Sequence, residues 1–120
     1  MVLVWCFLIF LLAGETSPLA DEQDLENLIF AIATRHDVNP TLFRNIAKCE
    51  SGLRVDAKNS ISSASGIMQF LTSTFISQAN AYGLPTDNKN DAKIQLELAA
   101  RMIANGGISH WSESKSCWDK

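Results

Sequence analysis

The stretch from Asn39 to Leu53, NPTLFRNIAKCESGL, constrains the fold most, because it predicts a helix whose apolar face ends in a carboxylate. Asn39 and Pro40 predict the start of this helix, since Asn caps free backbone N–H groups and Pro fits the first helical position. Gly52 predicts its end. Four residues recur at helical spacing and share one face: Phe43, Ile46, Ala47 and Glu50.

Glu50 is the acidic residue on that apolar face. Burial disfavours the ionised form of a carboxyl group, so we expect the pKa of Glu50 to lie above its ordinary value. A carboxyl group that stays protonated near neutral pH can act as a general acid. Glu50 is therefore the candidate catalytic residue.

Residues 1–14, MVLVWCFLIFLLAG, form an apolar run without a charged side chain. The run is shorter than the ~18 residues of a membrane span and suits the apolar core of a secretory signal. We expect a signal peptide over residues 1–20 and one domain over residues 21–120, exported to a periplasmic or extracellular location. Cleavage after Ala20 is preferred, while earlier cleavage and an uncleaved membrane anchor stay open.

Cys49 and Cys117 are the two cysteines that lie outside the expected signal. In an exported protein two cysteines most simply form a disulfide, whereas two free thiols are expected if export is wrong. Closing a loop of this length would stabilise the fold by about 4 kcal/mol in the chain-entropy model. The bond would also tie the C-terminal tail beside Glu50.

Charge and histidine content argue against two other classes of function. The formal net charge is −3 and no cluster of Lys and Arg is present, so nucleic acid is not an expected partner. His36 and His110 are far apart and show no ligand spacing with the cysteines, so we expect neither a metal nor a cofactor. His36 instead closes a helix.

Helical spacing of apolar residues predicts three further helices, over Asp21–His36, Ile67–Tyr82 and Asp91–Ala104. Asn105-Gly106-Gly107 ends the last of them. The segment Arg54–Gly66 is polar and Ser-rich, so we expect a loop or short hairpin, which either lines a sugar-binding cleft or is simply solvated. No alternating pattern is long enough for a buried sheet, and the fold class is therefore mainly α.

Three short motifs follow one another along the chain: Glu50-Ser51-Gly52, Gly66-Ile67-Met68-Gln69 and Asn105-Gly106-Gly107. Their order resembles the lytic transglycosylase SLT family, which shares the goose-type lysozyme-like fold. The resemblance covers roughly residues 37–111. It implies that Glu50 is the catalytic acid and that the segment around Gly66 lines a glycan groove. The residues that we assign to substrate binding are Ser51, Ser65, Gly66, Met68, Gln69, Phe70, Tyr82 and Asn105.

The third motif departs from the family pattern. The family has A-Y-N at this point, and its tyrosine hydroxyl supports the catalytic glutamate, but Ala104 stands in the tyrosine position here. Tyr82 is the only tyrosine in the chain, and it either replaces that hydroxyl or packs as an ordinary core or surface residue. Trp111 and Trp118 either stack on sugars or pack beside the disulfide.

The resemblance implies cleavage of the β-1,4 bond between N-acetylmuramic acid and N-acetylglucosamine in peptidoglycan glycan strands, with a 1,6-anhydromuramic product. Most glycosidases use two carboxylates, and Asp56 is the nearest acid downstream of Glu50, although folding could bring Asp87 or Asp91 close. A lysozyme-type hydrolase and a peptidoglycan-binding module without catalysis are the alternatives. We expect a monomer, and association with an envelope-spanning apparatus stays open.

Overall fold

The structure is a computed structural model that describes the backbone from residue 18 to residue 120 and the side chains from residue 21. Most of the expected signal segment, residues 1–17, lies outside the described part, so the signal and its cleavage stay predictions. Within residues 18–120, no helix combines the length and the apolar character that a membrane crossing needs.

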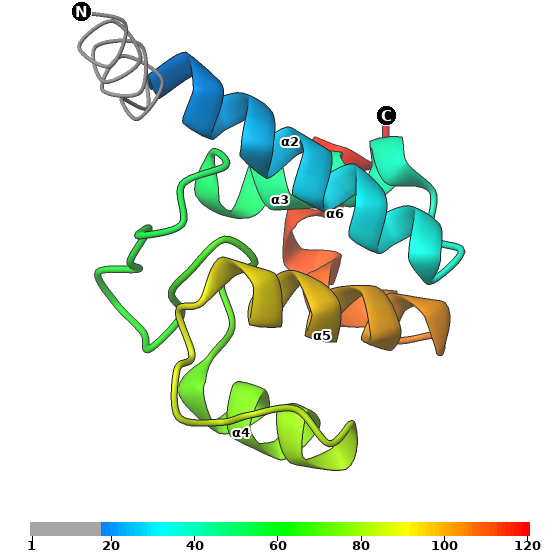
Figure 1. The fold of residues 1–120 in the computed structure, drawn as a ribbon. Coiled ribbons are helices and arrows are strands. Elements are labelled where there is room, and N and C mark those ends of the chain that lie inside the picture. The colour runs from blue at the N-terminus through cyan, green and yellow to red at the C-terminus, as the bar shows by residue number, and fades with distance from the viewer. Residues whose placement is uncertain (1–17) are drawn as a thin grey trace, which may run out of the picture.

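Helix α2, Pro18–Arg35, begins three residues before the predicted start, with Pro at its first position. It packs against α3, Pro40–Ser51, and against α5, Ala92–Ala104 (Figure 1). Its buried residues lie at helical spacing and face these two helices: Ile29, Ile32 and Ala33. The apolar face predicted for this segment is therefore a core face.

Helix α3 begins and ends where its sequence predicts. The Asn39 side-chain oxygen accepts a hydrogen bond from the Leu42 backbone N–H at 3.0 Å, which caps the first turn. Gly52 follows in the left-handed conformation, at φ 65°, and its N–H donates to the Lys48 carbonyl. Such a cap stops the helix directly after Ser51 and fixes Glu50 in its last turn.

Helix α4, Thr72–Ala81, is shorter than predicted. The predicted helical turn from Ile67 to Leu71 is wrong: these residues form turns and isolated β-bridges, one of them between Ser65 and Phe70. Gln69 has a left-handed φ of 55°, which no helix accommodates. The apolar spacing in this segment reflects burial rather than helical geometry.

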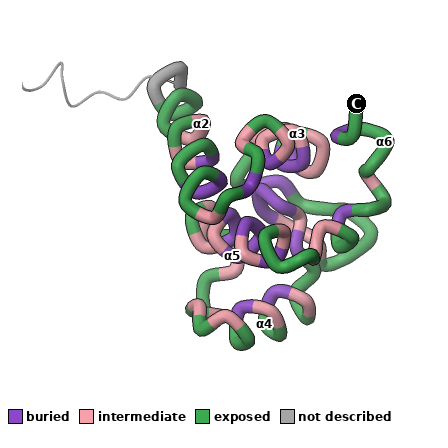
Figure 2. Tube along the Cα trace, turned by 90° about the vertical axis from the view of Figure 1, so that its right-hand side faces the viewer, coloured by how far each residue is buried: buried purple, intermediate pink, exposed green. Residues whose placement is uncertain are grey.

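The C-terminal tail consists of the 3-10 helix η1, Ile108–Ser114, and the short helix α6, Lys115–Trp118. Both pack against α3, and α5 lies between the α2–α3 pair and α4 (Figure 1). Figure 2 shows the buried residues gathered in the interior between these helices. The described part of the chain is helical with isolated β-bridges, which confirms the mainly α class.

Glu97 links α5 to the end of α2. Its carboxylate accepts hydrogen bonds from Arg35 at 2.6 Å and contacts His36 at 3.0 Å. Burial alone would raise the pKa of Glu97, but the hydrogen bonds and charges of Arg35 and His36 outweigh burial and lower it. His36 is thus part of a helix–helix contact, in agreement with its expected place at the end of a helix.

Candidate active site

Glu50 lies in the last turn of α3 with its side chain half-buried. The Ser114 hydroxyl donates a hydrogen bond to Glu50 Oε2. Desolvation raises the pKa of Glu50 above its ordinary value, the Ser114 hydrogen bond opposes this rise, and the negative charge of Glu113 adds to it. The direction agrees with the sequence prediction and keeps the carboxyl protonated at a higher pH than a free glutamate.

Ser114 reaches Glu50 from the tail, at the junction of η1 and α6. Its hydroxyl also lies 3.1 Å from the Trp111 carbonyl, to which it can donate, and it accepts from Trp118 Nε1 at 3.1 Å. Both tryptophans are buried, with 4% and 6% of their surface exposed. The structure therefore supports the packing alternative for Trp111 and Trp118.

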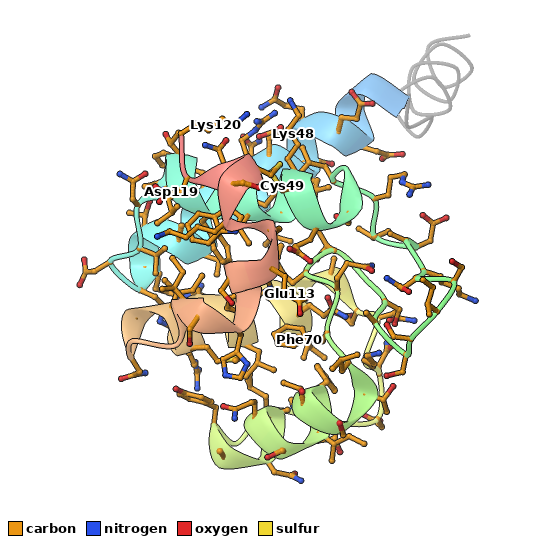
Figure 3. All side chains as sticks on the ribbon, turned by 180° about the vertical axis from the view of Figure 1, so that it is seen from behind. Lys48, Cys49, Phe70, Glu113, Asp119 and Lys120 are labelled. Carbon is orange, nitrogen blue, oxygen red and sulfur yellow. A yellow bond between two sulfur atoms is a disulfide. The ribbon has the colours of Figure 1, made fainter. Side chains whose placement is uncertain are left out.

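A disulfide joins Cys49 to Cys117, with 6.1 Å between the two Cα atoms, and confirms the predicted pair. It connects α3 to α6 at the residue that precedes Glu50. Figure 3 shows Cys49, Glu113 and Phe70 one below the other on the face along which the tail runs. The tail therefore lies beside the end of α3, as the sequence predicted.

The segment from Gly66 to Phe70, here called the wall, is held in place by one side chain of α5. Gln95 is fully buried, accepts from the Met68 backbone N–H at 2.9 Å and donates to the carbonyls of Ser65 at 3.0 Å and Lys89 at 2.9 Å. Gly66 has φ 88°, and a Cβ there would clash with the Gln95 amide. The wall therefore needs glycine at this position.

Two residues assigned to substrate binding, Met68 and Phe70, face the interior. Met68 has no exposed surface and Phe70 has 3%. The Phe70 ring packs edge-on against Trp111 with centroids 5.7 Å apart, and Trp111 Nε1 donates to the Met68 carbonyl at 3.1 Å. In this structure these side chains support the wall from inside and join it to the tail.

Three further residues assigned to substrate binding make polar contacts within the protein: Ser51, Ser65 and Gln69. The Ser51 hydroxyl donates to the Ala47 carbonyl at 3.0 Å, and only 4% of Ser51 is exposed. Ser65 is partly exposed and donates to Asn90 Oδ1 at 2.7 Å. Gln69 is partly exposed and donates to the Gly66 carbonyl at 2.9 Å. Ser65 and Gln69 thus keep surface for a ligand, whereas Ser51 is committed to its own helix.

Tyr82 and Asn105 lie at the ends of α4 and α5. Tyr82 follows α4 and is packed against the core, with its carbonyl accepting from Arg101 at 3.1 Å. Asn105 ends α5, is exposed, and donates to the Arg101 carbonyl at 2.8 Å. Among residues 21–120, no hydrogen bond joins either side chain to Glu50, and the structure favours the packing alternative for Tyr82.

A hollow of about 100 Å³ lies between the wall and η1. Its volume is of the order of a small substituent rather than a sugar ring, and it combines polar and aromatic groups. Its lining residues are Gln69, Phe70, Leu71, Thr74, His110 and Trp111. The hollow therefore presents polar and aromatic groups to a ligand beside the wall.

Sequence reasoning did not find Ser114 and Gln95. Gln95 carried a signal, because it is a polar residue three and four positions before Leu98 and Ala99 on a buried helix face. Ser114 lies three residues before Cys117, and the predicted disulfide already brought this part of the chain to Glu50.

Comparison with known families matches residues 27–107 to the family described as the transglycosylase SLT domain. The matched region runs from α2 through α5, contains Glu50 and the wall, and ends before Ser114. It agrees with the expected mainly α, lysozyme-like fold. Comparisons with curated proteins and with solved structures gave no match. Because the match covers more than half of the sequence, this chain belongs to the transglycosylase SLT domain family.

Proposed function

We propose that this domain is a peptidoglycan lytic transglycosylase that uses Glu50 as its single catalytic carboxyl group. Membership of the SLT family supports a peptidoglycan-directed, glycan-cleaving activity. The observation that carries the assignment of Glu50 is its half-buried position with a raised pKa, at the end of an otherwise apolar helix face. A carboxyl in this state stays protonated to a higher pH than a free glutamate and can serve there as a general acid.

The reaction has two proton transfers and leaves Glu50 unchanged. Protonated Glu50 donates to the glycosidic oxygen as the bond from the muramyl C1 to that oxygen breaks, which frees the C4 hydroxyl of N-acetylglucosamine. The muramyl C6 hydroxyl then attacks C1, and its proton passes to the Glu50 carboxylate. The products are a 1,6-anhydromuramic end and a free N-acetylglucosamine end, and no water is consumed.

The positions of the other acids support a single catalytic carboxyl. Asp91 caps α5, its side-chain oxygen accepting from the Ile94 N–H at 3.0 Å, so it is occupied in a structural contact. Asp56 and Asp87 are exposed loop residues. None of the three contributes to the pKa shift of Glu50.

The hydrolase alternative is favoured by one observation, which is the effect of the Glu113 charge on Glu50. The charge of Glu113 contributes to the raised pKa of Glu50, after desolvation and the Ser114 hydrogen bond, and Glu113 was not identified from the sequence. In a two-carboxylate hydrolase, an ionised Glu113 would activate a water molecule while Glu50 protonates the leaving group. The transglycosylase needs no such base.

Product analysis separates the two reactions. We expect mass spectrometry of digests of purified peptidoglycan to show 1,6-anhydromuramic ends. The Glu113→Gln variant should release the same products at a rate close to that of wild type, because the C6 hydroxyl is the nucleophile. Reducing muramic ends in wild type, lost together with activity in Glu113→Gln, would establish the hydrolase instead.

The cellular setting is part of the same proposal. Glycan strands of peptidoglycan lie outside the cytoplasmic membrane, so the proposed substrate requires the export expected from the N-terminal apolar run. We propose that the exported domain acts as a monomer in the periplasm or outside the cell. Association with an envelope-spanning apparatus would bring it to a chosen place in the wall.

A further inference from the structure

The tail adds a functional group to Glu50 from outside the part of the chain that matches the SLT family. The match ends at residue 107, whereas Ser114 and Cys117 lie beyond it. Ser114 is separated from Glu50 by 64 residues and still donates a hydrogen bond to its carboxylate. The contact between Ser114 and Glu50 therefore depends on the position of the tail, which lies outside the matched region.

We propose that Ser114 is a positioning residue for the Glu50 carboxyl and that the Cys49–Cys117 disulfide keeps it in place. The inference rests on the proposed function, since it gives Ser114 a role in the reaction of Glu50. Ser114 acts through Glu50 and does not itself need to touch the glycan.

The hydroxyl of Ser114 serves both protonation states of Glu50. It carries one proton and has two acceptors in reach, Glu50 Oε2 and the Trp111 carbonyl. When Glu50 is ionised, Ser114 donates to it. When Glu50 is protonated, the proton lies on Oε1, from which it can reach the glycosidic oxygen, and Oε2 continues to accept the hydrogen bond from Ser114. The carboxyl therefore keeps one orientation through the catalytic cycle, with Oε2 engaged and Oε1 left for the substrate.

Two anchors hold Ser114 at this position. Trp111, three residues earlier, is fixed by its Nε1 hydrogen bond to the Met68 carbonyl and by its ring contact with Phe70. Cys117, three residues later, is bonded to Cys49. Because the first anchor is on the wall and the second is on α3, the hydroxyl is placed relative to both sides of the site.

The hydrogen bond from Ser114 is the main contact that stabilises the ionised form of Glu50. Glu113 on η1 opposes ionisation. Arg44 on α3 is paired with Glu26 of α2 at 2.7 Å. Lys115 and Asp119 pair with each other at 3.5 Å. Removing the Ser114 hydroxyl should therefore raise the pKa of Glu50 further.

The test compares Ser114→Ala with Ser114→Thr, which keeps the hydroxyl, and with Ser112→Ala, which removes an exposed hydroxyl from the same 3-10 helix. We expect Ser114→Ala to lower kcat about 10- to 100-fold with little change in KM, the size expected for one hydrogen bond to a charged group. Ser114→Thr should restore most of the rate, and Ser112→Ala should match wild type. Trp118 Nε1 keeps its other acceptor, the Trp111 carbonyl at 3.0 Å, so Ser114→Ala leaves no buried donor without a partner.

The pH dependence distinguishes positioning from a general loss of structure. A general acid must be protonated, so activity falls as the pH rises through the pKa of Glu50. In Ser114→Ala this alkaline limb should move to higher pH. The titration of Glu50 followed by NMR of its carboxyl carbon should move in the same direction. An unchanged titration of Glu50 in Ser114→Ala would overturn the role of Ser114.

Reduction of the disulfide tests the second half of the inference. If the bond acts by holding Ser114, reduction should bring wild type down to the rate of Ser114→Ala and change that variant by only about twofold, since two changes that remove one contact are not additive. Circular dichroism before and after reduction monitors the fold. A further large loss in reduced Ser114→Ala would show that the bond serves the whole fold and would overturn this half.

The titration also separates this inference from the proposed function. A wild-type protein that releases no product from peptidoglycan contradicts the proposed function. The Glu50 titration does not depend on turnover, so an upward shift in Ser114→Ala still supports the contact as the feature that sets the state of the carboxyl. The absence of that shift contradicts the inference even if wild type is active.

Discussion

The Gln95 region of α5 and the Glu50 end of α3 both place a polar side chain on an apolar helix face, yet the molecule treats them in opposite ways. Gln95 has no exposed surface, and its amide is engaged in three hydrogen bonds to backbone groups. Glu50 is half-buried, and within the described part of the chain Ser114 is the one side chain that forms a hydrogen bond with it.

The number of hydrogen bonds that a buried polar side chain makes within the protein distinguishes a structural group from one that is available for chemistry. The amide of Gln95 uses its hydrogen-bonding groups to hold the wall, so it has no free donor for a ligand. Glu50 has spare acceptor capacity, and burial keeps its pKa raised, so its two protonation states are closer in free energy near neutral pH. Loss of Gln95 should therefore cost stability, and loss of Glu50 should cost activity.

The largest expected effect comes from Glu50→Gln. Removing the general acid should lower the cleavage rate about 100- to 10,000-fold, while binding to insoluble peptidoglycan stays near wild type. Because folding favours the protonated form of Glu50, ionisation costs stability above its usual pKa, and the neutral amide should not lower the free energy of unfolding at pH 7. Rates from soluble product release and midpoints from urea unfolding provide the two measurements.

If wild type and Glu50→Gln release equally little product but both bind peptidoglycan, the domain is a binding module. A large loss of stability in Glu50→Gln would remove the contrast with Gln95, because Glu50 would then be structural as well.

The second effect is on stability. Gln95→Met keeps the volume but leaves the Met68 N–H and the carbonyls of Ser65 and Lys89 without their partner. We expect the free energy of unfolding to fall by about 2 to 4 kcal/mol, because unsatisfied buried groups are costly. Urea unfolding measures the change. The matched control is Gln23→Met, on an exposed position of α2, which should shift the midpoint little.

A Gln95→Met variant as stable as wild type would mean that the wall finds other partners. The rate of cleavage in this variant adds a second readout. Since the Met68 carbonyl also holds Trp111, a displaced wall should lower activity as well.

The smallest effect is expected for Glu97 of α5, which is the third polar residue in this comparison. Its folded pKa is lowered, so its stabilising contribution is present above the ordinary glutamate pKa and is lost as pH falls through the lowered value. Glu97→Gln should cost about 1 kcal/mol near neutral pH, in the range of a partly exposed ion pair.

The same substitution should flatten the loss of stability in acid. Unfolding midpoints measured from pH 7 down to pH 3 test this. Equal acid sensitivity in wild type and variant would assign that sensitivity to other carboxylates. Gln23→Met again provides the control.

Local rules were enough to predict the bounds of α3 and the position of Glu50 in its last turn. Asn39, Pro40 and Gly52 act on backbone groups within one helical turn, so the printed sequence already holds the information that starts and ends the helix. The Cys49–Cys117 pair followed from elimination, since only two cysteines lie outside the expected signal. The raised pKa of Glu50 followed from the apolar residues around it.

The wall and its links could not be predicted in the same way. Ile67 and Phe70 lie three residues apart, as on one face of a helix, because both are buried, and that spacing says nothing about the left-handed turn at Gln69. The deciding bonds come from Gln95, 27 residues from Met68. Ser114 and Glu50 are 64 residues apart, so their contact could be identified only from the path of the tail.

The disulfide has a consequence for chain topology. Along the backbone, Glu50 and Ser114 are distant, but Glu50 adjoins Cys49 and Ser114 lies three residues before Cys117. When the disulfide is formed, the covalent path from Glu50 to Ser114 through Cys49 and Cys117 is therefore short. Closing a short loop costs less entropy than closing a long one. The disulfide therefore keeps Glu50 and Ser114 at a high effective concentration even before the helices between them have folded.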